Sequence, residues 1–160
     1  MARKVGTFYR GIPNETRVAL SKTRGLTSHG ALSYLKRHKT PKAIPLTKMR
    51  TISNQFSKKH RVQVKITDDR RIFSKQHGAY DRSHLATHHA DGLAVGEDIY
   101  LHPVLQYYSE NHLRDVLNHE YDHAMVARKR HALWRKQGFR PHHQQADGIW
   151  VWYKDSKPKA

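Results

Sequence analysis

The segment His119-Glu120-Tyr121-Asp122-His123 is the most informative part of this sequence. Two histidines four residues apart lie on one face of a helix, so both imidazoles can reach the same metal ion. The glutamate beside the first histidine then lies near the open position of the metal, where a carboxylate can take a proton from a water molecule. The spacing therefore predicts a zinc site with His119 and His123 as ligands and Glu120 as the general base.

The sequence on both sides of the motif predicts that it lies within one long helix. Ser109 is a suitable N-cap, and Glu110 places an acid in the first turn, where the helix dipole favours it. Apolar residues then recur at steps of three and four, and neither Gly nor Pro interrupts the run as far as Gln137. Gly138 and Pro141 supply the stop signal.

The rest of the chain carries weaker patterns, in the order helix, strand, strand, motif helix. The predicted elements are a short helix at 30–35, an amphipathic helix from Leu46 to about His60, a half-buried strand at 62–66, a second short strand at 98–101, and an aromatic segment at 149–153. Residues 1–28 are polar and show no sustained period, so we expect an arm without regular structure until it binds a partner.

Positive charge is concentrated in the first part of the chain. Residues 1–60 contain 14 Lys and Arg against a single acid, Glu15, for a net charge of +13, whereas residues 61–160 have a net charge of +4. Such an asymmetry is typical of proteins that bind polyanions, most often nucleic acid. We therefore expect a basic, nucleic-acid-contacting segment at 1–44 and a catalytic domain at 45–160.

Composition also limits the chemistry and the location of the protein. The chain has no Cys, so disulfides and thiolate ligands are excluded and a zinc site must use His and carboxylate. No apolar run approaches the roughly 20 residues of a membrane span. The expected location is the cytoplasm, in association with nucleic acid, and a phage or viral assembly is the alternative setting.

The motif and its neighbours resemble the SprT-like zinc metalloproteases. The matching segments are 99–103, 113–124, Pro141-His142 and the tryptophans Trp150 and Trp152. The resemblance implies an α+β fold with a compact, gluzincin-like zincin core, in which a small sheet packs on a long active-site helix. It also implies a peptide substrate lying along the strand before that helix, and action on DNA-bound proteins.

The third protein ligand of the zinc ion is not fixed by the motif. No Glu follows the motif glutamate, so a downstream glutamate ligand is excluded. His142 and His143 follow a glycine turn that lets the chain fold back, and in that arrangement Asp147 would orient a ligand histidine. His131 is the other candidate, but in an unbroken helix it lies about 12 Å along the axis from His123, so we favour His142 or His143.

A second group of polar residues precedes the strand at 98–101. It consists of His84, His88, His89 and Asp91. No apolar period around these residues supports a helix that would bring them onto one face, so they are assigned no role.

Two functions remain open at this level. The first is a zinc-dependent peptidase acting on proteins near or bound to nucleic acid, with its protein substrate in the zinc cleft. The second is a basic structural component of a virion, nucleoprotein or other large assembly, with a zincin-like fold and little or no catalysis. The feature that favours the second function is the net charge of residues 1–60, which is higher than a peptidase requires.

Overall fold

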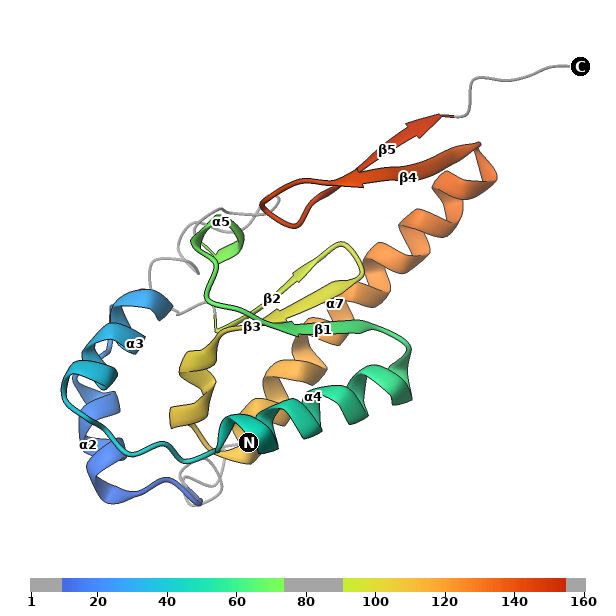
Figure 1. Cartoon of the computed structure of the whole chain (residues 1–160). Coiled ribbons are helices and arrows are strands. Elements are labelled where there is room, and N and C mark those ends of the chain that lie inside the picture. Colours follow the sequence, from blue (N-terminus) through green and yellow to red (C-terminus); the bar gives the residue numbers. More distant parts are fainter. Residues whose placement is uncertain (1–9, 74–90, 155–160) are drawn as a thin grey trace, which may run out of the picture.

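The computed structural model describes residues 10–73 and 91–154, and their fold belongs to the α+β class (Figure 1). These residues form five α-helices, one 3-10 helix, a three-stranded sheet and a two-stranded hairpin. The elements are α2 (Asn14–Ser21), α3 (Ser28–Arg37), α4 (Leu46–His60), β1 (Gln63–Ile66), α5 (Arg70–Phe73), β2 (Gly92–Val95), β3 (Asp98–Leu101), η1 (Pro103–Tyr107), α7 (Glu110–Lys136), β4 (Phe139–Gln144) and β5 (Trp150–Lys154).

The three-stranded sheet is mixed, with the strand order β1-β3-β2. β1 pairs in parallel with β3, and β2 pairs with β3 in antiparallel orientation. The strands at 62–66 and 98–101 were predicted, whereas β2 was not. The strand that precedes α7 is therefore central rather than an edge, which corrects the expectation drawn from the family resemblance. Among the described residues, the strand with an unpaired edge next to α7 is β2.

The long helix α7 packs its apolar side on this sheet and on α4, as its sequence period predicted. Ser109 caps the helix, because its side chain accepts a hydrogen bond from the backbone N–H of His112 at 3.1 Å. One buried stripe runs the length of the helix, and it consists of Leu113, Leu117, Glu120, Ala124, Ala127 and His131. Glu120 and His131 are thus the two polar members of an otherwise apolar stripe.

The N-terminal region is more ordered than its sequence predicted. Within the segment expected to lack regular structure, residues 14–21 form α2, while residues 1–9 lie outside the described part. The helix is held because Thr16 is buried and its hydroxyl donates to the carbonyl of Pro41 at 2.5 Å, while Leu20 enters a core shared with α3 and η1. The division of the chain after residue 44 stays a prediction, although residues on both sides of it contribute to this core.

The C-terminal residues form a hairpin that folds back from the end of α7 toward the three-stranded sheet (Figure 1). Its strand β5 coincides with the aromatic segment at 149–153, which was not assigned to a strand. β4 was not predicted either, because Pro141 interrupts the pattern and coincides with an irregularity in the strand register. Trp152 anchors the hairpin to α7 by packing on His131 and Trp134, with ring centroids 4.6 and 5.4 Å apart.

No α-helix in residues 10–73 and 91–154 combines the length and the apolar character that a bilayer crossing requires.

Candidate metal and catalytic site

The two motif histidines converge on the surface of α7. Their Nε2 atoms lie 3.2 Å apart, with the ring planes at 78° to each other. Two imidazoles bound to one tetrahedral zinc at about 2.0–2.1 Å would hold their nitrogens roughly 3.3 Å apart, so the pair is already spaced as two such ligands are. Burial and the neighbouring His119 ring lower the pKa of His123, which favours the neutral form that binds a metal.

Glu120 lies beneath this pair and is buried, with 8% of its surface exposed. Burial raises the pKa of Glu120 to about 7, although a hydrogen bond from the backbone N–H of Ala94 opposes that rise. One carboxylate oxygen lies 4.0 Å from Nε2 of His119. A carboxyl group whose pKa lies near neutrality can both take up and release a proton at physiological pH.

β2 approaches α7 unusually closely beside Glu120. A Cβ atom on Gly92 would collide with Cγ1 of Val116 and would lie 3.3 Å from Cγ of Glu120. Only a glycine therefore allows the strand to lie this near the helix, and Ala94, two residues later, donates its N–H to the glutamate from the same strand. Neither residue was predicted from the sequence, although an isolated glycine before an apolar run is a recognised sign of close backbone approach.

The structure does not bring His142 and His143 to the motif histidines. Both are exposed on β4, with their Nδ1 atoms 2.8 Å apart, and both rings contact the Tyr153 ring. Within residues 10–73 and 91–154, no group of three or more metal-binding side chains is assembled. The choice of third ligand therefore stays a prediction. Asp147 accepts a hydrogen bond from the backbone N–H of Ile149 and stabilises the hairpin turn.

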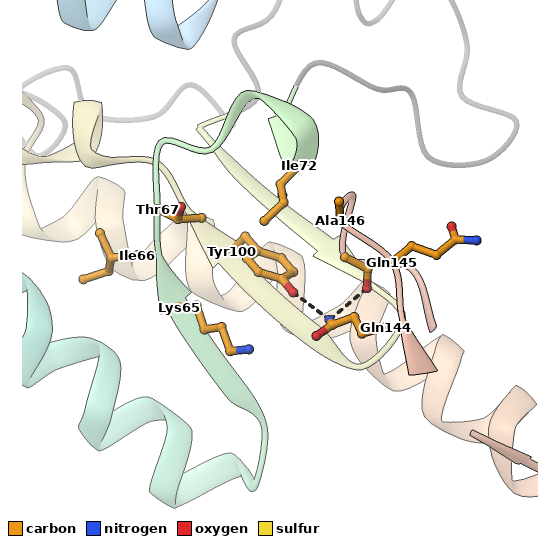
Figure 2. Close-up of a pocket in the computed structure, with 9 residues that line it drawn as sticks. Lys65, Ile66, Thr67, Ile72, Tyr100, Gln144, Gln145 and Ala146 are labelled. Atoms are coloured by element: carbon orange, nitrogen blue, oxygen red, sulfur yellow. Dashed lines mark hydrogen bonds between the residues drawn. The ribbon is translucent and has the colours of Figure 1, made fainter. Parts of the chain in front are cut away.

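The hairpin turn also closes a cavity of about 490 Å³ on the sheet, which Figure 2 shows. The side-chain amide of Gln144 donates to the Tyr100 hydroxyl and to the carbonyl of Gly148, each at 3.0 Å. These bonds fix the turn to β3. None of the histidines of the motif or of β4 lines this cavity, so it is separate from the candidate metal site.

His131, the other candidate ligand, is occupied by different partners. Its Nδ1 lies 2.7 Å from a carboxylate oxygen of Glu97 in the β2–β3 turn, and Arg128 donates to the same carboxylate at 3.2 Å. The ring also stacks on Trp134 and Trp152. These contacts account for a buried histidine on α7 without a metal.

A further histidine cluster joins α3 to the end of β3. Nδ1 of His29 lies 3.3 Å from Nε2 of His102, and burial lowers the pKa of His102 to about 4. Asp91 accepts from the Ser28 hydroxyl at 3.3 Å and lies 3.9 Å from His112. His84, His88 and His89 lie outside the described residues.

Comparison with models of protein families, with curated proteins and with solved structures finds no match for the chain. The functional conclusion therefore depends on the geometry of the motif residues and of β2.

Proposed function

We propose that the chain is a zinc-dependent peptidase of the SprT-like type, with a zincin-like core, that acts on proteins near or bound to nucleic acid. One observation carries the proposal: the Nε2 atoms of His119 and His123 converge to 3.2 Å, and the carboxylate of the buried Glu120 lies 4.0 Å from the Nε2 atom of His119. Burial raises the pKa of the Glu120 carboxyl group to about 7, and such a buried, perturbed carboxyl group is more typical of a functional site than of a solvated helix face.

The two motif histidines would hold the metal, and the third ligand is proposed to be His142 or His143. In the structure both rings contact Tyr153, so this choice requires the β4–β5 hairpin to change position when the metal binds. A bound zinc ion would supply Lewis acidity, which polarises a carbonyl group and makes a water molecule more acidic.

Glu120 is proposed to act as the general base and then to return the proton to the leaving amine. The N–H of Ala94 holds the carboxylate, and its raised pKa suits a group that both accepts and donates a proton. The unpaired edge of β2 offers backbone groups to an extended peptide next to this carboxylate. Gly92 keeps that edge close to the catalytic helix.

Nucleic acid is proposed as the partner that brings the enzyme to its protein substrate. Residues 1–44 contain ten Lys and Arg residues and a single acid, Glu15. Helices α2 and α3 carry part of this charge on a folded support, and Lys22 and Arg24 are exposed in the turn between them.

The test is a comparison of the full-length, zinc-loaded protein with its Glu120→Gln variant in the cleavage of an unfolded or DNA-bound protein. The amide keeps the shape of the side chain but cannot take up the proton, so cleavage should fall by about 10²–10⁴-fold while zinc content stays the same. Glu110→Gln makes the same chemical change at an exposed position of α7 and should leave the rate unchanged.

The same comparison separates the two functions that the sequence left open. Equal cleavage by wild type and Glu120→Gln would refute the peptidase mechanism. If neither protein cleaves any substrate, with zinc bound and nucleic acid present, the result favours the assembly component.

A further inference from the structure

The exposed side of α4 carries two parallel rows of polar side chains that the proposed function does not use. Residues at positions i, i+4 and i+8 lie above one another on a helix, so each row runs along the helix axis. The six residues of these rows, all exposed, are Arg50, Asn54 and Lys58 in the first row and Thr51, Gln55 and Lys59 in the second. We refer to them as the polar face of α4.

The apolar residues of α4 fix the direction of this face. Met49 and Ile52 are buried in the main core, and Ser53 is buried beside them, with its hydroxyl donating to the carbonyl of Met49 at 2.8 Å. The opposite side of the helix therefore points to solvent. Figure 1 shows α4 at the border of the molecule, leading directly into β1.

The polar face is positively charged and is not neutralised by neighbouring acids. Residues 46–60 include four Lys and Arg and no Asp or Glu. Lys48 pairs with Glu110 at 3.5 Å, but in the part of the chain that the structure describes no carboxylate forms an ion pair with Arg50, Lys58 or Lys59.

Helix stability explains only part of this composition. Lys58 and Lys59 lie in the last turn, where cations interact favourably with the helix dipole. That effect is confined to the last turn, so it does not account for Arg50 in the first half of the helix. Neither does it account for Asn54, a poor helix former that lies in the middle of the helix.

The size of the helix and the placement of its charges suit a groove of double-stranded DNA. An α-helix with its side chains is about 10–12 Å across, and the major groove of B-form DNA, about 12 Å wide, admits one. Arg50 and Lys58 are about 12 Å apart along the helix axis, so with α4 lying in the groove the cations at both ends of the face can reach the phosphates that line it. Asn54 and Gln55 lie between them, and side-chain amides are the groups that form paired hydrogen bonds with adenine.

We propose that α4 docks in the major groove of B-form DNA, with Arg50, Lys58 and Lys59 on phosphates and Asn54 and Gln55 at the base edges. The major groove of A-form RNA is too deep and narrow for a helix, so duplex RNA does not bind this face. This surface is separate from the segment at 1–44 and operates without zinc chemistry, so it stands even where the peptidase proposal fails.

The experiment measures binding of the full-length protein to short DNA duplexes of different sequence by fluorescence anisotropy over a range of salt concentrations. Lys58→Ala/Lys59→Ala should weaken binding roughly tenfold and reduce the salt slope by about one to two units, because fewer counterions are released. Wild type should bind different DNA sequences with affinities that span about 5- to 100-fold. Asn54→Ala/Gln55→Ala should narrow that range and leave the salt slope unchanged. All four positions are exposed and alanine favours a helix, so the fold is retained, as circular dichroism will check.

Two control variants remove the same number of cations elsewhere. Lys129→Ala/Arg130→Ala changes an exposed site on α7 and should leave DNA affinity within about twofold. Lys22→Ala/Arg24→Ala tests the N-terminal segment, so the two nucleic-acid surfaces are distinguished. The proposal is refuted if the α7 control weakens binding as much as the α4 variant does. It is also refuted if Lys58→Ala/Lys59→Ala weakens binding to duplex RNA as much as binding to duplex DNA, or if wild type shows no preference among DNA sequences.

Discussion

The two halves of α7 use histidine in opposite ways. In the first half, His119 and His123 are exposed and face each other, and the polar group buried below them is a carboxylate with a pKa raised to about 7. In the second half, His131 is itself the buried group, and Glu97 and two tryptophans surround it. The partners of His131 come from other elements and bury its ring, which indicates a structural role. His119 and His123 are exposed and direct their Nε2 atoms at each other, which is the arrangement that the proposed metal site requires.

The largest expected difference between the two halves is in zinc affinity. His123→Ala removes one of the two proposed zinc ligands on α7, so its zinc affinity should fall by at least about two orders of magnitude, and the zinc affinity of His119→Ala should fall equally. His131→Ala should still bind about one equivalent, measured by competition with a chromogenic chelator. The His142→Ala/His143→Ala double variant tests the third ligand and should also lose zinc. Loss in His131→Ala, with retention in the double variant, would reverse the assignment.

The free energy of unfolding should fall more in His131→Ala than in His119→Ala, which is the opposite of the order expected for zinc affinity. His131→Ala removes a buried ring and leaves Glu97 without one of its donors, which should lower the free energy of unfolding by about 2–3 kcal/mol. His119→Ala changes an exposed side chain and should alter stability by no more than about 0.5 kcal/mol in the metal-free protein. Urea unfolding monitored by tryptophan fluorescence measures both. Equal losses in the two variants would mean that the halves of α7 do not differ as described.

The elements that the sequence predicted well are those with strong local signals. α7 was expected from its cap, its period and its stop signal, and α4 and β3 were expected from their apolar spacing. The pair His119 and His123 follows from the geometry of one helix, which no tertiary contact is needed to define.

The features that the sequence did not reveal depend on contacts between distant residues. β2 is four residues long and begins with Gly92, so it has no pattern of its own and is defined by pairing with β3 and by contact with α7. The bond between Glu97 and His131 joins residues 34 apart. α2 was missed because its few apolar residues become buried only against α3 and η1.

The smallest expected effect concerns the pH dependence of the free energy of unfolding, through the contact of Glu97 with His131 in the second half of α7. Burial opposes the ionisation of Glu97, but hydrogen bonds from His131 and Arg128 outweigh it and hold the pKa of Glu97 below its usual value of 4.5. A carboxylate with a lowered pKa in the folded state stabilises the fold above the pKa of the unfolded chain, and that contribution is lost as the pH falls through the folded value. The difference in stability between wild type and Glu97→Gln should therefore shrink as the pH falls from about 4.5 through the folded pKa of Glu97.

Urea unfolding of both proteins at several pH values measures this difference, with Glu110→Gln as the control because Glu110 of α7 forms ion pairs with the exposed cations Lys48 of α4 and Arg114 of α7. The control should show a smaller difference at neutral pH, since surface ion pairs contribute little. A gap between wild type and Glu97→Gln that stays constant down to about pH 3 would show that the carboxylate charge does not stabilise the contact. The structural role of His131 would then depend on its tryptophan contacts alone, and the contrast between the halves of α7 would rest on packing rather than on charge.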